Sequence, residues 1–398
     1  MEVKQWVKIP DVLFFQEGPG VRNSQYTEEG IKLLNVANLV DGKIDLTTSN
    51  RYISESEAYG KYKHFLCDDG DFIVASSGIK VEYINKKMGF VTKSMLPLCM
   101  NTSTIRFKVL DKSRLNIKYF MYYLKSQNFK NQLYKYITGS AQLNFGPSHL
   151  KKIIFPLCDI GEQKIIVNNM DLITKIMDSY NEQLEKYDEL IKARFIEMFG
   201  DESNPFDWPI VTVDSVADVQ VGVVIKPAQY YADRINGIKT FRSLNVGEMN
   251  VKDTDWVYFS EEGNRKNIKS ILKEHDLLII RSGTPGTACV IEKQYEGCNA
   301  IDLIIAHPNK KYINPYYLCM FTNSALGKRQ IDEGTGGAAQ QHFNVGKYKK
   351  MKIFYPPMAK QQDFECFFKQ VDKSREEVKK SLEKTQQLYD SLMQEYFG

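Results

Sequence analysis

The feature that most constrains the fold is an internal repeat, because this 398-residue chain carries one pattern twice at a period of about 200 residues. The strand-like segment 71–78 matches 276–283, and the segment 138–145 matches 336–343. Shorter matches in the same order are Trp6 with Trp208, Gly20-Val21 with Gly222-Val223, and Met198-Phe199-Gly200 with Tyr396-Phe397-Gly398. Shared strand propensity explains one or two such matches but not a collinear series. We therefore expect two similar domains.

Each repeat consists of a mixed α/β part followed by a helical part in which apolar residues recur at alternating steps of four and three. This spacing is the seam of a coiled coil. The first seam comprises Ile166, Met170, Ile173, Met177, Tyr180, Leu184, Tyr187 and Ile191, and the second comprises Phe364, Phe368, Val371, Val378, Leu382, Tyr389 and Leu392. Arg375 and Thr385 interrupt the second seam, and polar residues at such positions often determine register.

The fold class expected is α+β, with two tandem mixed α/β domains separated by two long helices that form an antiparallel coiled coil. The predicted boundaries are 1–157 for the first domain, 158–200 for the first helix, 201–357 for the second domain and 358–398 for the second helix. A helix of this length spans roughly 57 Å at about 1.5 Å per residue, which suggests a rod with one domain at each end. The alternative is that each helix packs on its own domain.

The net charge of +4 hides a segregation of charge along the chain. The two helical segments are acidic in sum, whereas residues 112–158 and 334–362 contain several Lys and no Asp or Glu. Lys and Arg neutralise phosphates, and the Asn, Gln and Ser residues among them can read base edges. A single basic tract is usually a solvated surface, but two tracts at corresponding places of a repeat favour DNA binding.

The sequence lacks the motifs of a catalyst. The five His residues show no metal-ligand spacing, so no metal site is predicted, and no Walker loop is present. Asn314-Pro315-Tyr316-Tyr317 partly resembles the loop of amino-methyltransferases, but its third residue differs, and we interpret it as a turn that starts a helix. We therefore predict that the chain is not an enzyme and has no catalytic residues of its own.

The cell compartment is also constrained by the sequence. No run of about 18 apolar residues occurs, and the N-terminus has no secretory pattern, so we expect a cytoplasmic protein without a membrane span. The seven Cys residues are scattered and never spaced as CxxC, so we interpret them as buried thiols in a reducing compartment.

Four duplicated features together identify a resemblance to a known family. They are the tandem domains that start near a Trp, the SSG and RSG turns at 76–78 and 281–283, the TGSAQ and GGAAQ loops, and the long helices ending in Phe-Gly. In this order the features resemble the specificity subunit of Type I restriction–modification systems, over the whole chain. The resemblance implies that each mixed part is a target-recognition domain and that each helix is a spacer. It further implies one half-site of an asymmetric bipartite DNA target per domain, with adenine methylation or restriction carried out by partner subunits.

The resemblance also implies the partners. These are double-stranded DNA, two methyltransferase subunits and restriction subunits that act as motor and nuclease, with no membrane. No cofactor is expected on this chain, because S-adenosylmethionine, ATP and Mg are expected on the partner subunits. The competing hypotheses are a coiled-coil adaptor or anti-restriction decoy that reads no sequence, and a stand-alone methyltransferase or nuclease.

Candidate DNA-binding residues lie in the turns after the matched strands, in the matched polar loops, and in a basic stretch with Lys80, Lys86, Lys87 and Lys93 that we expect to contact phosphates. Glycines there permit a close backbone approach, and a bidentate Arg–guanine pair makes Arg281 the strongest candidate for base reading. The predicted residues are Ser76, Ser77, Gly78, Lys80, Lys86, Lys87, Thr138, Gly139, Ser140, Gln142 and Asn144 in the first domain, and Arg281, Ser282, Gly283, Thr284, Thr335, Gly336, Gln340, Gln341 and His342 in the second. The alternative is that these loops only stabilise the fold or contact a partner subunit.

Overall fold

The computed structural model describes residues 5–137, 143–335 and 343–398, with the backbone alone at 143, 144, 334 and 335. The chain divides into two compact units, which are Met1–Tyr180 with Ser381–Gly398, and Asn181–Lys380. We call them unit 1 and unit 2. Each unit contains one mixed α/β part, one half of helix α5 (Ile160–Phe199) and one half of helix α10 (Met358–Phe397).

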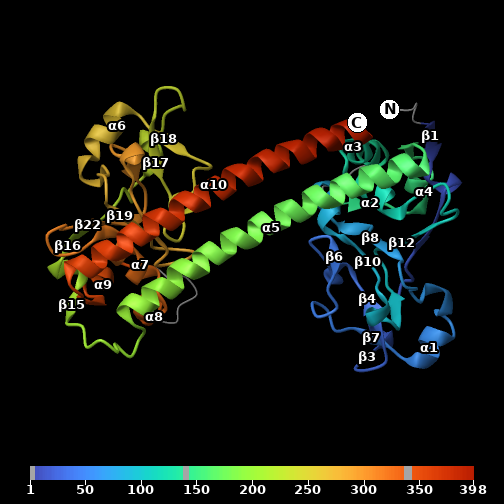
Figure 1. Cartoon of the computed structure of the whole chain (residues 1–398), viewed down its shortest axis with the longest axis horizontal. Helices are drawn as coiled ribbons and strands as arrows, with labels where there is room; N and C mark the ends of the chain where they lie inside the picture. The colour runs from blue at the N-terminus through green and yellow to red at the C-terminus, as the bar shows by residue number, and fades with distance from the viewer. Residues whose placement is uncertain (1–4, 138–142, 336–342) are drawn as a thin grey trace. The chain divides into compact units, whose positions relative to one another are not determined.

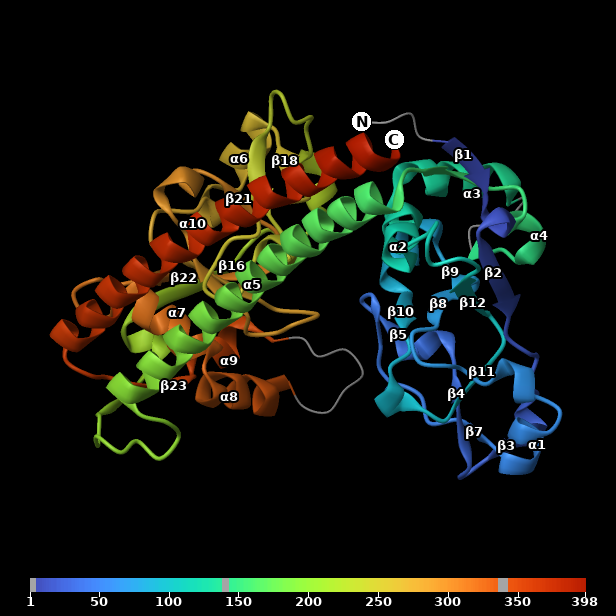
Figure 2. The same cartoon turned by 45° about the vertical axis from the view of Figure 1, so that its right-hand side comes forward.

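Unit 1 is built on two four-stranded sheets, with strand orders β10-β8-β12-β2 and β11-β4-β7-β3. Strand β8 is buried along its whole length, which accounts for its uninterrupted apolar sequence. Helices α2, α3 and α4 gather around the start of α5 and the end of α10 (Figure 1, Figure 2). The elements are β1 (Gln5–Lys8), β2 (Leu13–Glu17), β3 (Tyr26–Thr27), β4 (Ile31–Leu34), β5 (Leu39–Val40), β6 (Lys43–Ile44), β7 (Tyr52–Ile53), α1 (Glu55–Tyr59), β8 (Phe72–Ala75), β9 (Ser77–Ile79), β10 (Met88–Phe90), β11 (Leu98–Met100), β12 (Thr104–Val109), α2 (Ile117–Lys125), α3 (Gln127–Tyr136), β13 (Leu143–Asn144), α4 (Pro147–Leu150) and β14 (Ile154–Leu157).

Unit 2 repeats this plan with a four-stranded sheet in the order β16-β22-β19-β20 and a three-stranded sheet in the order β18-β17-β21. Strand β19 matches β8, since it also is buried throughout and lies between two antiparallel neighbours. The elements are β15 (Ile210–Thr212), β16 (Ala217–Val221), β17 (Ile238–Phe241), β18 (Val257–Phe259), α6 (Glu261–Lys266), β19 (Leu277–Ile280), β20 (Ala288–Val290), β21 (Asn299–Ala300), β22 (Leu303–Pro308), α7 (Pro315–Asn323), α8 (Ala325–Thr335), α9 (Val345–Lys349) and β23 (Lys352–Phe354).

Helices α5 and α10 pack together in both units and run in opposite directions. In unit 1 the Asn169 side-chain amide donates to the Tyr396 hydroxyl at 3.2 Å. In unit 2 the Arg375 guanidinium pairs with the Asp188 carboxylate at 3.0 Å. Residues late in α10 therefore face residues early in α5, and the reverse, which confirms the antiparallel pairing predicted from the two seams.

The residues of the predicted seams are all buried or half-buried. The buried members are Ile166, Met170, Ile173, Ile191, Phe364, Phe368 and Val371, and the half-buried members are Met177, Tyr180, Leu184, Tyr187, Val378, Leu382, Tyr389 and Leu392. The ends of the helices belong to the cores of the two units, whereas the middle residues remain half-buried. Arg375 at its seam position is buried and pairs with Asp188 across the helix pair and with Asp372 on its own helix.

A buried glutamine attaches the first turn of each long helix to its mixed part. In unit 1 the side chain of Gln163 accepts a hydrogen bond from the Asn116 amide at 2.8 Å and donates to the Cys158 carbonyl at 2.9 Å. In unit 2 the side chain of Gln361 accepts a hydrogen bond from the Asn314 amide and donates one to the Pro356 carbonyl, both at 2.8 Å. The two glutamines occupy corresponding places of the repeat, so the repeat extends to this buried polar joint.

Replacing Gln163 by leucine is expected to lower the free energy of unfolding of unit 1 by about 1–3 kcal/mol, because buried backbone groups lose their partners. Urea unfolding, monitored by hydrogen exchange of the amides in unit 1, measures this change in the free energy of unfolding. The matched control is Asn168→Leu, at an exposed position of the same helix within unit 1, which should change the free energy by less than about 0.5 kcal/mol. Equal effects of the two substitutions would contradict the role of the joint.

The Asn314-Pro315 motif begins α7 as predicted. The Asn314 side chain accepts hydrogen bonds from the amides of Tyr316 and Tyr317 at 2.9 and 3.2 Å, which is the arrangement of a helix N-cap. The Tyr317 hydroxyl donates to the Phe354 carbonyl at 2.9 Å, and in unit 1 Tyr119 donates to Pro156 at 2.8 Å. The motif is therefore a structural start of a helix, repeated in both units.

The cysteines follow the sequence prediction with two exceptions. Cys67, Cys99, Cys289, Cys298 and Cys319 are buried free thiols, whereas Cys158 is half-buried and Cys366 is exposed on α10. Burial raises the pKa of Cys67 and of Cys289 to about 12, so both thiols remain protonated at neutral pH. The prediction of burial is wrong for Cys366 because its side chain lies on the outer face of its helix.

Among the described residues, no helix combines the length and apolar character that crossing a membrane requires.

Candidate nucleic-acid interface

The candidate interface in unit 1 is the turn that follows the buried strand β8. The amide of Ser76 donates to the carbonyl of Ser103, and the carbonyl of Ser76 accepts from the amide of Phe145, at 2.8 and 2.9 Å. Strand β13 pairs with β9, so the backbone of Asn144 lies beside Ser77. The turn and the end of the predicted polar loop, which are far apart in the sequence, therefore meet in the folded unit.

The conformation of this turn requires glycine. Gly78 has a φ angle of +74° and Gly283, at the matching place in unit 2, has a φ angle of +89°. An L side chain is strained in this region, whereas glycine adopts it readily. A Cβ atom at either position would meet no neighbouring atom within 4 Å, so the backbone there is open to a ligand.

The corresponding turn in unit 2 has the same backbone connection and different side chains. The amide of Phe343 donates to the carbonyl of Arg281 at 2.9 Å, as Phe145 does to Ser76. The Arg281 guanidinium pairs with the carboxylate of Asp302 and donates from Nε to the Phe343 carbonyl at 3.4 Å. Its side chain is only 11% exposed, so Arg281 is part of the framework of the turn.

Ser103 and Asp302 are the partners that the sequence analysis missed. Both have a positive φ angle, 66° and 49°, and both precede the sheet strands β12 and β22 by one residue. In unit 1 the Ser77 hydroxyl donates to the Ser103 hydroxyl at 2.5 Å, whereas in unit 2 Asp302 binds Arg281. Extending the repeat alignment through residues 98–109 and 299–308 places these two residues at the same position, and this is the signal that identifies them.

The structure distributes the predicted residues unevenly. Gly78, Lys80, Lys86, Ser282, Gly283 and Thr284 are exposed, and Ser77 and Lys87 are half-buried, with the Lys87 ammonium donating to the Leu39 carbonyl at 2.7 Å. Thr138, Gly139, Ser140, Gln142, Gly336, Gln340, Gln341 and His342 lie outside the described residues, as do the side chains of Asn144 and Thr335.

Two predicted residues have side chains that are covered or engaged within the turn. Ser76 is 1% exposed, so its hydroxyl does not reach the surface, because the residue still belongs to the buried end of the strand. The Arg281 guanidinium is paired with Asp302 and directed to the Phe343 carbonyl, and base reading by Arg281 stays a prediction. The surface of each turn is therefore formed by the residues that follow, and Arg281 stabilises it from below.

A buried polar network lies at the start of the buried strand in each unit, at the end opposite the turn, and is also duplicated. In unit 1 the Arg106 guanidinium pairs with Asp71 at 3.1 Å and contacts the Gln16 side chain. In unit 2 the imidazole of His307 lies 2.6 Å from Asp276 and 2.8 Å from Gln220. The carboxylates occupy matched positions before β8 and β19, and the glutamines lie on the matched strands β2 and β16. Each network joins the central strands to the outer strand of the sheet.

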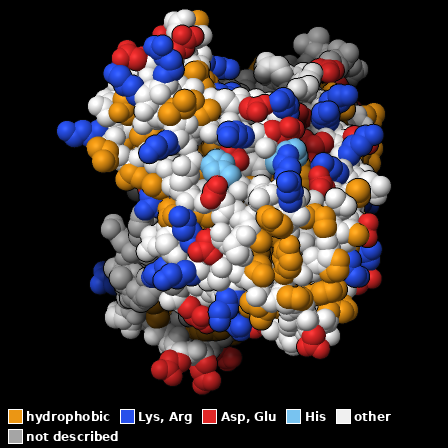
Figure 3. All heavy atoms as spheres, turned by 90° about the vertical axis from the view of Figure 1, so that its left-hand side faces the viewer, with side chains coloured by type: hydrophobic (Ala, Val, Ile, Leu, Met, Phe, Trp, Pro, Cys, Tyr) orange, Lys and Arg blue, Asp and Glu red, His pale blue; other side chains and the backbone are white. Residues whose placement is uncertain are grey.

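The basic tract of residues 112–158 is only partly a solvated surface. Lys118 pairs with Asp171 of α5 at 2.6 Å, and the Lys125 ammonium lies 5.0 Å from the centre of the Tyr122 ring. Burial lowers the pKa of both Lys125 and Lys130. Lys151 and Lys152 are exposed. On the face of unit 2 seen in Figure 3, Lys and Arg side chains alternate with Asp and Glu and do not form one continuous basic patch.

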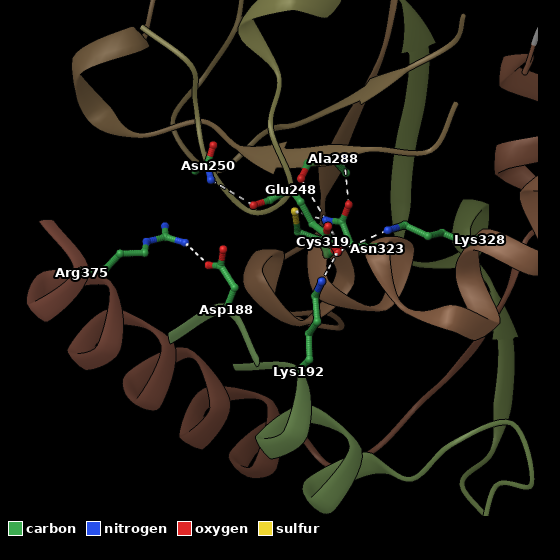
Figure 4. A network of polar contacts seen from close by, with 9 residues as sticks. All are labelled: Asp188, Lys192, Glu248, Asn250, Ala288, Cys319, Asn323, Lys328 and Arg375. Atoms are coloured by element: carbon green, nitrogen blue, oxygen red, sulfur yellow. Dashed lines mark hydrogen bonds and ion pairs between the residues drawn. The ribbon is translucent and has the colours of Figure 1, made fainter. Parts of the chain in front are cut away.

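A further network ties the second domain to the long helix α5 (Figure 4). The Glu248 carboxylate lies 3.3 Å from the ammonium groups of both Lys192 on α5 and Lys328 on α8. Nearby, Asn323 donates to the Ala288 carbonyl at 2.9 Å and accepts from its amide at 3.0 Å. Because the members come from separate elements, no local sequence pattern predicts this network. Within residues 5–137, 143–335 and 343–398, no group of three or more His, Cys, Asp or Glu side chains is placed to hold a metal ion.

The chain contains two equivalent domains. Each has one open turn at the end of a buried strand, and each is joined to the same antiparallel helix pair. These features define a two-domain recognition protein. The sequence matches the Type I restriction modification DNA specificity domain over residues 8–186 and 205–387. The chain therefore belongs to this family, and it is a DNA specificity subunit of the Type I restriction–modification class, as its resemblance predicted. The specificity subunit is the non-catalytic subunit of such systems, which agrees with the prediction for this chain.

Individual relatives cover the chain to different extents. It is 21% identical to the StySPI specificity subunit of Salmonella potsdam, over 93% of this chain and 82% of that protein. It is 27% identical to the MjaVIII specificity subunit of Methanocaldococcus jannaschii, but that match spans only 45% of this chain and 42% of the relative.

Two solved structures have the same fold along the whole chain. The Type I specificity subunit from M. genitalium matches with a TM-score of 0.55 and 15% identity, covering 100% of this chain and 97% of the other. A chain from a structural study of complex assembly and conformational transition in the Type I system matches with a TM-score of 0.58 and 15% identity, covering 100% and 98%. At this identity the likeness supports the fold alone.

Proposed function

We propose that the chain reads an asymmetric bipartite DNA target, with one half-site for each target-recognition domain, residues 1–157 and 201–357. The observation that carries this proposal is the pair of equivalent turns. Their backbones share the same hydrogen bond to Phe145 and Phe343, but the side chains at matched positions differ, with Ser76 and Ser103 in one turn and Arg281 and Asp302 in the other. Equal scaffolds with different side chains are suited to reading two different sequences.

The DNA contacts we propose are the exposed residues of the two turns, two exposed lysines that follow the first turn, and the polar loops that end beside the turns. They are Gly78, Lys80 and Lys86 in unit 1 and Ser282, Gly283 and Thr284 in unit 2, with Thr138–Asn144 and Thr335–His342 as the loops. Backbone amides and lysines would bind phosphates and so position the domain, and the hydroxyl and amide side chains would read base edges.

The partners of the bound chain would supply the chemistry. Two methyltransferase subunits would methylate adenines that are flipped out of the duplex, and restriction subunits would cleave unmodified DNA in the cytoplasm. S-adenosylmethionine, ATP and Mg would bind to those subunits. The antiparallel helices α5 and α10, which expose Ile165, Leu172 and Leu388, offer them a surface.

The test is to co-express the chain with its methyltransferase subunit and to map N6-methyladenine in the DNA of the host. The expected result is one motif with two specified parts separated by unspecified base pairs. Methylation that is absent, or that follows no two-part motif, would contradict the proposal and favour an adaptor or decoy without sequence reading.

A further inference from the structure

An exposed loop of unit 2 lies beside the turn at 281–283, which is the candidate interface of that unit. Val223 is buried, and it is followed by Val224, Ile225 and Lys226, which are all exposed. Val224 is 49% exposed and Ile225 is 79% exposed, so two adjacent apolar side chains of this loop face solvent. The loop ends at Tyr230, which packs with Val223 in the same small core. We call residues 224–229 the second tip loop.

Backbone hydrogen bonds place this loop against the turn. The amide of Val223 donates to the Ala300 carbonyl at 2.8 Å, and the carbonyl of Val223 accepts from the amide of Asp302 at 3.1 Å. Asp302 is the residue that binds Arg281. Ile225 follows Val223 by two residues, a distance that the chain spans in at most about 7 Å. The exposed isoleucine is therefore continuous with the candidate interface.

Unit 1 has a loop at the same place. Val21 is buried and packs in one core with Tyr26, as Val223 does with Tyr230. Between them lie Arg22, Asn23, Ser24 and Gln25, which we call the first tip loop. The side chains of Arg22, Asn23 and Ser24 are exposed.

The glycine that precedes each tip loop refines the repeat alignment. Gly18 donates to the Thr104 carbonyl as Gly222 donates to that of Leu303, at 2.8 and 2.9 Å, so Gly18 and not Gly20 corresponds to Gly222. Pro19 and Gly20 are an insertion in unit 1. A Cβ atom at Gly18 or Gly222 would lie 2.0 or 2.3 Å from a carbonyl oxygen, so both positions require glycine.

The two tip loops thus share a position and differ in polarity. Resting on the proposed function, we infer that each tip loop contributes to reading its half-site, and that Ile225 contacts the 5-methyl group of a thymine in the major groove. Apolar side chains recognise this methyl group, whereas Arg and Asn recognise the edges of guanine and adenine. Arg22 and Asn23 would therefore make polar contacts in the first half-site, and Lys226 beside Ile225 would bind a phosphate.

The experiment uses the assembled complex with its methyltransferase subunits and a duplex that carries the mapped target. Each thymine of the second half-site is replaced in turn by uracil, which removes only the methyl group. For the native complex we expect affinity to fall about fourfold at one position, as for the loss of one buried methyl group. The Ile225→Ala complex should bind the thymine duplex more weakly and show no further loss with uracil at that position.

The matched control is Ile235→Ala, which removes another exposed isoleucine, 91% exposed, from outside the tip loop and should keep the uracil sensitivity of the native complex. The inference is overturned if the native and Ile225→Ala complexes lose the same affinity at each uracil, or if the second half-site contains no thymine. It is also overturned if size-exclusion chromatography shows that the Ile225→Ala protein does not assemble with the methyltransferase subunits. In each of these cases the native complex still binds its bipartite target, so the proposed function is judged separately. The proposed function fails if the native complex shows no two-part sequence preference.

Discussion

Replacing Phe199 by alanine is expected to lower the free energy of unfolding of unit 2 by about 3–5 kcal/mol, the usual effect of removing a fully buried aromatic ring. Phe199 has no exposed surface and ends α5. Its ring centre lies 4.7 Å from that of Tyr317 on α7 and 5.9 Å from that of Phe364 on α10. The substitution therefore leaves a cavity where three helices meet.

Hydrogen exchange of the Phe199→Ala protein should show the loss of protection in unit 2 and little change in unit 1. The matched control is Ile196→Ala, one turn earlier and 54% exposed, for which a change below about 0.5 kcal/mol is expected. The repeat supplies a second test, since Phe397→Ala removes the equivalent ring, 5.0 Å from Tyr119, and should affect unit 1 instead. Equal destabilisation by the control, or loss of protection in the wrong unit, would contradict the assignment.

Replacing Arg281 by alanine should weaken binding to DNA that carries the second half-site by about 10–100-fold, the range for losing hydrogen bonds to a charged group. The side chain holds Asp302 on one side and the Phe343 carbonyl on the other. Without it, the Asp302 carboxylate, which is 44% exposed, would face the DNA unpaired. The end of the polar loop at Phe343 would also lose an anchor.

The comparison with Asp302→Asn distinguishes positioning from base reading. If Arg281 positions the turn, both variants weaken binding without changing the preferred base at any position, and Arg281→Lys recovers part of the affinity. If Arg281 reads a base, Arg281→Ala alone relaxes one position of the methylation motif. Assembly with the methyltransferase subunits, followed by size exclusion, should be normal in all three variants. Unchanged affinity in Arg281→Ala would refute both roles.

The internal repeat predicts more of the fold than any other feature of the sequence. It located the buried strands β8 and β19, the two long helices and the turns at 76–78 and 281–283, because these depend on local patterns of apolar residues and glycine. Its finer alignment was less accurate, since Gly20 matched Gly222 by sequence whereas the backbone pairs Gly18 with Gly222. An insertion of two residues in a loop leaves no periodic trace, so only the hydrogen bonds reveal it.

The site was predicted in outline and not in detail. The sequence placed Ser76 and Arg281 at the ends of strands, but burial of Ser76 and the pairing of Arg281 depend on Ser103 and Asp302, which lie more than 20 residues away. The tip loops were missed altogether. Exposed apolar residues such as Ile225 look like core residues in a sequence, and their exposure becomes evident only once the neighbouring Val223 has been placed.

By itself the sequence determined the duplication, the heptad seams and the two-domain plan, because amphipathic periodicity and turn chemistry act over a few residues at a time. The tertiary structure decided which side chains face solvent and which are paired. It directed Arg281 to Asp302, covered Ser76 and left Ile225 exposed, since each of these outcomes depends on strands that meet from distant parts of the chain.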